Sequence, residues 1–262
     1  MDQMTPCFNY HDCENCPIRE RGVCARCDDR ELVPLNEIKY YRSYEAGQTM
    51  VWSGDAMDFV GSVVTGIATL TQTLGDGRRQ MVGLLLPSDF VGHPGRACAA
   101  YDVTATTDIV MCCVRKKPFE DMMLQTPHLL QRLLEITLDE LDASREWMLL
   151  LGRKTAREKI ASLISIIARR DASAHAAGSG GVTIALPLSR EAMADYLGLT
   201  LETVSRQISA LKHDQVIVIE RKRRITIPDM DRLLEEAGDD TDGGMPVREG
   251  DPKLVPRSSA RQ

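Results

Sequence analysis

Cysteines are the residues of this sequence whose type and spacing point most directly to chemistry. Five of the eight lie within the first 27 residues, namely Cys7, Cys13, Cys16, Cys24 and Cys27. Cytoplasmic thiols are kept reduced, so a cluster of this kind is typical of a metal site rather than of a disulfide framework. The remaining three are Cys98 and the adjacent pair Cys112 and Cys113.

Zinc is one metal that this spacing could serve. The two knuckles Cys13-x-x-Cys16 and Cys24-x-x-Cys27 would supply four thiolates to a structural zinc ion, although the seven residues between them are few for a zinc ribbon. Free thiols are a further alternative, and they are the default for Cys7 and Cys98. None of the five histidines has a His or carboxylate partner at ligand spacing, so haem and mononuclear iron gain no support.

Length and composition place the chain among globular proteins. Its 262 residues suit two domains, and 43% hydrophobic with 27% charged residues excludes wholesale disorder. No 18 apolar residues run together, and the first ten residues lack the basic-then-apolar pattern of a signal peptide. We therefore expect a cytoplasmic protein without a membrane span.

Charge is distributed unevenly along the chain. Residues 1–149 carry 14 Lys and Arg against 22 Asp and Glu, whereas residues 150–236 carry 14 against 11. Any contact with nucleic acid is therefore expected in the last third.

Short strands separated by glycines are the first of the elements that would position the cysteines. Residues 1–30 lack periodic apolar residues, and we expect them to be ordered by something other than a hydrophobic core. From Ile38 to about Val114, glycines recur every 6 to 12 residues between short apolar runs. This spacing is typical of an antiparallel barrel or sandwich with tight turns.

A long helix is predicted over roughly 127–151. One set of its residues follows alternating four- and three-residue steps and resembles the seam of a two-stranded coiled coil: Leu130, Leu134, Thr137, Leu141, Ser144, Met148 and Leu151. A second apolar set would rest on the barrel: Leu133, Leu138, Trp147 and Leu150. The helix could also pack on its own barrel alone. Thr137 and Ser144 should weaken pairing.

The pattern of the last third predicts a winged helix-turn-helix. An amphipathic helix (155–170) and a strand (183–186) precede a short helix from Ser189 to Gly198, a second helix from Thr200 to about His213, and two strands around a basic turn. Val204, Ile208, Leu211 and Leu201 would anchor the second helix to its domain. The loop 171–181 is expected to be exposed, and the tail from Gly238 to be disordered.

Residues near the start of that second helix could read DNA. Arg206 can donate twice to guanine, Glu202 can accept from cytosine, and Ser205 can bond either way. Contacts to phosphates are expected from Arg190, Gln207, Lys212, Arg221, Lys222, Arg223 and Arg224.

The stretch Leu199–Arg206 resembles the recognition helix of the CRP/FNR family of bacterial transcription regulators, in its FNR branch. The glycines noted above and the run Pro87–Gly92 fit that family's β-roll, apart from Ser88, where glycine is more common. The resemblance covers roughly residues 10–235 and implies an α+β fold: a cysteine-rich cluster-binding arm (1–30), a β-roll sensor domain (31–126), a dimerisation helix (127–152), a winged helix-turn-helix (153–237) and a tail (238–262). It implies a homodimer on TTGAT-N4-ATCAA-like double-stranded DNA, acting with RNA polymerase.

The same resemblance indicates which signal the sensor domain could detect. Relatives that bind cyclic AMP use a Gly-Glu step and an Arg-Ser pair, where this chain has Gly92-His93 and Ala99-Ala100, so no cyclic nucleotide is expected. Oxygen-sensing members hold one [4Fe–4S] cluster per subunit with three N-terminal cysteines and one from the β-roll. Carried onto this sequence, the ligands would be Cys13, Cys16, Cys24 and Cys112, with Cys27 as the substitute for Cys24.

An oxygen-responsive switch is the function that these implications favour. The intact cluster would order the arm and favour helix pairing, and its loss would separate the subunits. The alternatives are a CRP/FNR-type regulator with structural zinc or another small-molecule signal, and an iron–sulfur oxidoreductase. The chain has no flavin or nicotinamide fingerprint, so an enzyme is not expected.

Overall fold

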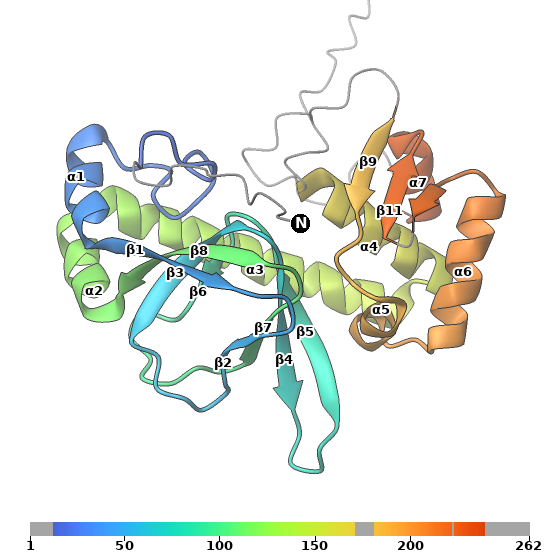
Figure 1. The fold of residues 1–262 in the computed structure, drawn as a ribbon, viewed down its shortest axis with the longest axis horizontal. Helices are drawn as coiled ribbons and strands as arrows, with labels where there is room; N and C mark the ends of the chain where they lie inside the picture. The colour runs from blue at the N-terminus through green and yellow to red at the C-terminus, as the bar shows by residue number, and fades with distance from the viewer. Residues whose placement is uncertain (1–12, 171–180, 222, 239–262) are drawn as a thin grey trace, which may run out of the picture.

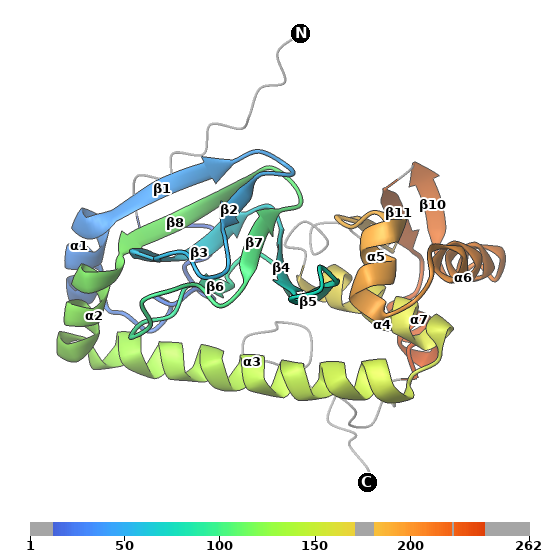
Figure 2. The same ribbon diagram turned by 90° about the horizontal axis from the view of Figure 1, so that it is seen from below.

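The computed structural model describes residues 13–170, 181–221 and 223–238. Figure 1 shows a β-rich lobe and a smaller mixed lobe, and Figure 2 shows the long helix α3 running beneath both. Cys7, Lys222, the loop 171–180 and the tail from residue 239 lie outside the described residues. No helix in the described part of the chain is long and apolar enough to cross a bilayer.

The β-rich lobe is an antiparallel roll of two four-stranded sheets. One sheet has the order β1-β8-β3-β6, formed by β1 (Lys39–Tyr44), β8 (Ile109–Arg115), β3 (Phe59–Thr65) and β6 (Phe90–Val91). The other has the order β2-β7-β4-β5, formed by β2 (Thr49–Val51), β7 (Asp102–Ala105), β4 (Ala68–Thr73) and β5 (Arg79–Leu85). Side chains of both sheets, such as Phe59 and Met111 of the first and Val103 of the second, meet in one buried core. The expected β-roll is therefore confirmed.

Three helices flank the roll. They are α1 (Asp29–Ile38), α2 (Lys116–Gln125) and the 27-residue α3 (Pro127–Arg153). Neither α1 nor α2 is predicted from the sequence, because each is only 10 residues long. Asp28 begins α1 with a capping box that includes Glu31.

The smaller lobe carries the remaining elements. They are α4 (Ala156–Arg170), β9 (Val182–Ala185), α5 (Arg190–Leu197), α6 (Leu201–His213), β10 (Val218–Arg221), β11 (Arg224–Ile227) and α7 (Met230–Glu236). The strands form a three-stranded sheet in the order β10-β11-β9. Side chains of α4, α5 and α6, among them Ile160, Leu197 and Ile208, fill its core.

The N-terminal segment is packed more closely than the sequence indicated. We call residues 13–28 the cysteine arm. Cys13 and Cys27 lie in an apolar cluster with residues of α1, α2 and α3, including Leu32, Phe119 and Leu129. Ile18 is also only 3% exposed. The expectation that no hydrophobic core orders this segment is therefore wrong, because its few apolar side chains are buried against elements far away in the sequence.

Candidate metal centre and nucleic-acid interface

The cysteine arm is a series of turns held together by one guanidinium group. Arg19 donates hydrogen bonds to the backbone carbonyls of Cys24 (2.7 Å), Ala25 (3.0 Å) and Cys27 (2.6 Å). Within the turns, the amide of Cys16 donates to the carbonyl of Cys13, and that of Cys27 to the carbonyl of Cys24. These bonds give the arm a defined path without a helix or strand.

Four thiols from two distant segments lie close enough to influence one another. Burial, followed by the nearness of Cys16, Cys24 and Cys13, raises the pKa of the Cys112 thiol to about 12. Burial, followed by the nearness of Cys16 and Cys13, raises the pKa of the Cys24 thiol to about 11. Four thiolates this close together would repel one another, so their deprotonation requires a positively charged metal centre among them.

The pleat of β8 separates the two adjacent cysteines. Cys113 is fully buried in the core of the roll, whereas Cys112 is partly exposed on the face that carries the arm. Gly61 lets β3 approach this part of β8, because a Cβ at Gly61 would lie 2.7 Å from the Cys112 carbonyl oxygen and 3.2 Å from the Cys113 sulfur. Successive strand residues point to opposite faces, so the structure brings Cys112 and not Cys113 to the arm.

Cys27 lies near Cys24 but also near two carboxylates. It is 4% exposed, and the groups that raise its pKa, after burial, are Cys24, Glu31 and Asp28. Acidic neighbours of this kind disfavour a further thiolate. Cys98 is exposed and lines a cavity described below.

The surroundings of the four thiols fit an iron–sulfur cluster. The ammonium of Lys39 donates to the Cys13 sulfur at 3.2 Å. Ser62 pairs directly with Cys112 across β3 and β8, and its buried hydroxyl has no hydrogen-bond partner among the described residues. An unsatisfied donor beside a candidate ligand suits a group that brings acceptor sulfur.

The arrangement fits a single metal ion less well. No three His, Cys, Asp or Glu side chains in the described ranges are placed to hold one ion. In a cubane each thiolate binds a different iron, so the ligands stand farther apart than around zinc. Sequence reasoning missed Arg19, Lys39 and Ser62, since their roles depend on turns and on strand pairing.

The predicted seam of α3 is uncovered over most of its length. Leu130, Leu134, Leu141 and Met148 are 46–66% exposed, and Thr137 and Ser144 are also exposed. Leu151, by contrast, is half-buried against the smaller lobe. The two seam hydroxyls donate to the carbonyls of Leu133 and Glu140, both at 2.8 Å. A partner helix would therefore meet hydroxyls whose donors are already satisfied.

The second predicted face of α3 needs one correction. Leu133, Trp147 and Leu150 pack against the two lobes, but Leu138 is 51% exposed. Leu138 stands nine residues before Trp147, so at about 100° per residue it points to the opposite side of α3 from that packed ring. Leu129, which sequence reasoning missed, is fully buried instead.

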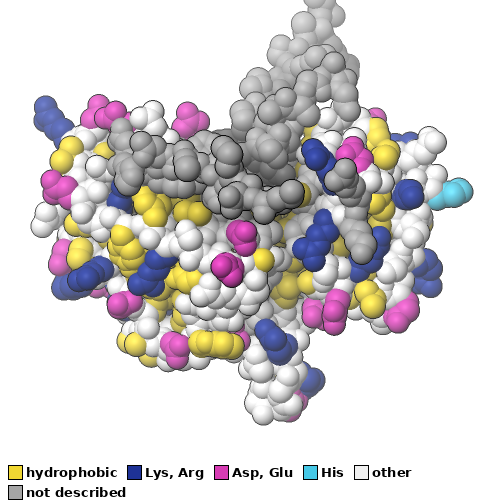
Figure 3. All heavy atoms as spheres, viewed as in Figure 1, with side chains coloured by type: hydrophobic (Ala, Val, Ile, Leu, Met, Phe, Trp, Pro, Cys, Tyr) yellow, Lys and Arg dark blue, Asp and Glu magenta, His cyan; other side chains and the backbone are white. Residues whose placement is uncertain are grey.

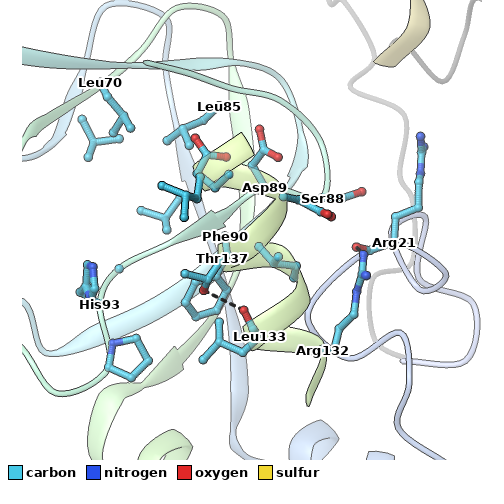
Figure 4. Close-up of a pocket in the computed structure, with 18 of the residues that line it drawn as sticks. Arg21, Leu70, Leu85, Ser88, Asp89, Phe90, His93, Arg132, Leu133 and Thr137 are labelled. Atoms are coloured by element: carbon cyan, nitrogen blue, oxygen red, sulfur yellow. Dashed lines mark hydrogen bonds between the residues drawn. The ribbon is translucent and has the colours of Figure 1, made fainter. Parts of the chain in front are cut away.

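A cavity of about 970 Å³ lies between the roll, α3 and the arm. Figure 4 shows Ser88, Asp89, His93 and Arg132 around it. His93, Ala99 and Ala100, which replace the family's phosphate-binding residues, line it. Two of its guanidinium groups are already paired, those of Arg132 with Glu135 and of Arg170 with Asp89.

Helices α5 and α6 form the expected helix-turn-helix. The Ser189 and Thr200 side chains accept hydrogen bonds from the amides of Ala192 and Thr203 and so begin the two helices. Gly198 ends α5 with φ 62°, a left-handed conformation that favours glycine. The sequence signals for both helices are confirmed.

The predicted base-reading residues lie on the outer side of α6. Glu202 and Arg206 are exposed and Ser205 is half-buried, while Val204, Ile208 and Leu211 are buried beneath them. Leu201 was expected to help anchor the helix, but it is 47% exposed because it stands at the first position, beyond the edge of the core.

The predicted phosphate contacts are more scattered. Lys212, Arg223 and Arg224 are exposed, and Arg224 also lies 3.6 Å from Glu220. Arg190 and Gln207 are half-buried, and a guanidinium nitrogen of Arg190 has no partner among the described residues. Lys222 and the Arg221 side chain are outside the description. Figure 3 shows Lys and Arg side chains spread over this lobe.

Comparison with known proteins matches both lobes to established families. Residues 41–126 match the cyclic nucleotide-binding domain, and residues 158–236 match the Crp-like helix-turn-helix domain. Two relatives span nearly the whole chain. The transcriptional activator protein FnrL of Cereibacter sphaeroides is 74% identical and covers 90% of this chain and 96% of its own length. The transcriptional activator protein Anr of Pseudomonas protegens is 31% identical, with coverage of 90% and 96%.

A solved structure agrees. FixK2 from Bradyrhizobium japonicum superposes with a TM-score of 0.68 and 31% identity, over 76% of this chain and 96% of that protein.

Proposed function

Because the chain belongs to the CRP/FNR family and is an FNR-type transcription regulator, we propose that it responds to oxygen through a [4Fe–4S] cluster held by Cys13, Cys16, Cys24 and Cys112. Its relatives and its fold are those of DNA-binding regulators and not of enzymes. The family implies that it binds DNA and forms dimers.

One observation carries the proposal: the arm thiols of Cys16, Cys24 and Cys13 lie close enough to the β-roll thiol of Cys112 to raise its pKa. The pairing of Cys112 with Ser62, whose hydroxyl is unsatisfied, supports the same set. Cys24 is preferred to Cys27 as the third ligand, because the carboxylates of Glu31 and Asp28 near Cys27 raise its pKa.

The chain's residues would convert cluster binding into DNA binding in three steps. A bound cluster would supply a group that oxygen can destroy. Ligation by Cys112 would tie the arm to β8, and the arm in turn contacts α3 through hydrogen bonds of Arg21 with Arg132 and of Arg26 with Glu135. Pairing of the exposed α3 seams would then place two α6 helices roughly 34 Å apart, which is the spacing of successive major grooves.

At each half-site, Arg206 would read guanine and Glu202 the partner strand, with Ser205 beside them. Exposed Lys212, Arg223 and Arg224 would contact phosphates, as would Arg190, Gln207, Arg221 and Lys222. The dimer is proposed to act on TTGAT-N4-ATCAA-like palindromes together with RNA polymerase. The cavity under α3 is not needed for this signal, and no cyclic nucleotide is proposed.

Anaerobic purification followed by iron, sulfide and zinc analysis tests the proposal. We expect about four iron and four sulfide per chain, and a gel shift of the palindrome that is lost after exposure to air. One zinc without sulfide would favour the structural-zinc alternative instead. Loss of the shift in air from a protein that never held iron would point to another signal.

A further inference from the structure

One stripe of polar residues on α3 makes the hydrogen bonds and ion pairs that join this helix to the cysteine arm and α1. The stripe consists of His128, Arg132 and Glu135. Arg26 of the arm lies 2.8 Å from the carboxylate of Glu135. Arg132 donates to the Arg21 carbonyl at 3.0 Å and lies 3.1 Å from Glu135. His128 lies 2.9 Å from Glu31, the residue that completes the cap of α1.

The stripe lies on the opposite side of α3 from the seam. Arg132 is two residues from both Leu130 and Leu134, and two residues turn an α-helix by about 200°. A change in the arm can therefore act on α3 without touching the surface that a partner helix would cover. The stripe and the seam occupy the same helical turns, so a shift or tilt imposed at one must move the other.

The arm partners of the stripe sit beside the candidate ligands. Arg21 and Arg26 flank Cys24 in the sequence, and Arg19 fixes the carbonyls of Cys24, Ala25 and Cys27. The segment from Arg19 to Cys27 is therefore expected to move as a unit. Displacement of Cys24 would displace the Arg21 carbonyl and the Arg26 side chain.

Partial burial makes these contacts sensitive to such a displacement. The side chain of Arg132 is only 15% exposed and that of Glu135 27%, and Arg132 Nε already has no partner among the described residues. If the arm withdrew, Arg132 would lose the Arg21 carbonyl and Glu135 would lose Arg26. A buried guanidinium that loses an acceptor favours a different helix position, where it finds water or another acceptor.

We propose that Arg132 and Glu135 are positioning residues that transmit the state of the cysteine arm to the dimerisation helix. This inference rests on the proposed function, since it explains how ligation by the arm acts on pairing. It assigns the transmission to side-chain contacts with the arm, and not to the seam or to the cap of α1.

A comparison of two loading states tests the inference. The dimer dissociation constants of the full chain and of its Glu135→Gln and Arg26→Gln variants are measured by anaerobic sedimentation, once after reconstitution with iron and sulfide and once without metal. Iron and sulfide are counted in every sample. Asp142→Asn is the matched control, because Asp142 pairs with Arg145 on the same helix at i and i+3 and has a comparable ion-pair distance of 2.8 Å.

We expect Glu135→Gln to weaken the loaded dimer about five- to tenfold while leaving its iron content and the metal-free dimer unchanged. The Arg26→Gln variant should also weaken the loaded dimer, and the double variant should be no worse than Glu135→Gln alone, since both substitutions remove the Arg26–Glu135 ion pair. The Asp142→Asn control should match the parent chain in both states.

Three results would overturn the inference. If the loaded Glu135→Gln dimer had the same dissociation constant as the loaded parent dimer, the Arg26–Glu135 contact would be excluded as the link between the arm and α3. Equal weakening in the loaded and metal-free states would show that Glu135 only stabilises the helix. A parent chain whose loaded and metal-free dimers are equally tight would overturn the proposed function, and the inference with it.

Discussion

Trp147 of α3 stacks on Tyr196 of α5, with ring centroids 4.2 Å apart and ring planes inclined by 22°. The long helix α3 thus directly contacts α5, the helix that precedes the recognition helix α6. The β-roll contacts the same lobe, through an ion pair between Asp89 and Arg170 and a hydrogen bond from Gln80 to the Asp195 carbonyl. The smaller lobe, which carries the helix-turn-helix, is therefore held against both α3 and the roll.

Removal of the stacked ring should loosen this contact. Trp147→Ala is expected to lower the free energy of unfolding by about 2 kcal/mol, because it loses apolar contact and a stacked aromatic pair. Urea unfolding followed by circular dichroism measures the loss. Leu149→Ala is the control, since Leu149 is 59% exposed two residues away. Equal effects of the two substitutions would contradict a special role for the stack.

Serine variants should distinguish the ligand cysteines from their neighbours. Cys112→Ser and Cys24→Ser are expected to lose most of the iron that the parent chain holds after anaerobic reconstitution. Cys113→Ser should keep it but unfold more readily, by about 1–3 kcal/mol, because it places a hydroxyl in the apolar core of the roll.

The Cys27→Ser variant completes that series. We expect it to retain iron, since Glu31 and Asp28 lie near Cys27 and disfavour a thiolate there. Iron and sulfide counts per chain measure each result, and thermal unfolding reports stability. Iron loss in Cys27→Ser with retention in Cys24→Ser would reverse the choice of third ligand.

Filling the seam should override the oxygen signal. Ser144 is exposed in the α3 seam, so Ser144→Leu would add apolar surface to a paired helix and stabilise the dimer by about 1–3 kcal/mol per subunit. The variant is expected to remain dimeric and to bind the palindrome in air. Sedimentation and gel shifts measure both properties.

Asp142→Leu controls for the added leucine, because Asp142 is exposed outside the seam. It should stay oxygen-sensitive. An oxygen-sensitive Ser144→Leu protein would show that pairing through this seam does not limit activity.

Substitution of Arg206 should affect sequence preference more than general affinity. Arg206→Ala is expected to cost about 1–3 kcal/mol on a palindrome with the matching guanine, and little on one without it. Lys212→Ala should instead weaken binding to both sequences alike and reduce the salt dependence, since a phosphate contact carries no base preference. Titrations at several salt concentrations compare the two variants. A uniform loss with Arg206→Ala would remove it from the base-reading set.

Acid stability of the smaller lobe should depend on Glu236. Hydrogen bonds from Arg157 lower the pKa of Glu236 below its ordinary 4.5. The stability gained from this pair is therefore present above about pH 4.5 and is lost as the pH falls through the lowered pKa. Glu236→Gln is expected to remove about 1 kcal/mol at neutral pH and to flatten the acid dependence.

Unfolding measured between about pH 6 and pH 3 tests this linkage. Glu235→Gln is the control on the same helix, because Glu235 is exposed. An unchanged acid profile in Glu236→Gln would show that other carboxylates govern acid unfolding.

Much of the fold could be predicted because its signals are local. Ser189, Gly198 and Thr200 mark helix ends through their own backbone and capping preferences, so α5 and α6 follow from a few adjacent residues. The β-roll and the exposed seam of α3 likewise follow from periodicities that each segment carries alone. Local patterns fail to predict the exposure of Leu138 and Leu201, because that exposure depends on where a neighbouring core ends.

The tertiary structure decided what local patterns leave open. Cys112 and Cys113 have the same chemistry and adjacent positions, and only the pairing of β8 with β1 and β3 directs one to the arm and the other into the core. The grouping of the cysteine arm with Cys112, and the link from Arg26 to Glu135, join residues about a hundred positions apart. Sequence alone determines which groups are available for chemistry, whereas packing between distant segments determines which of them meet.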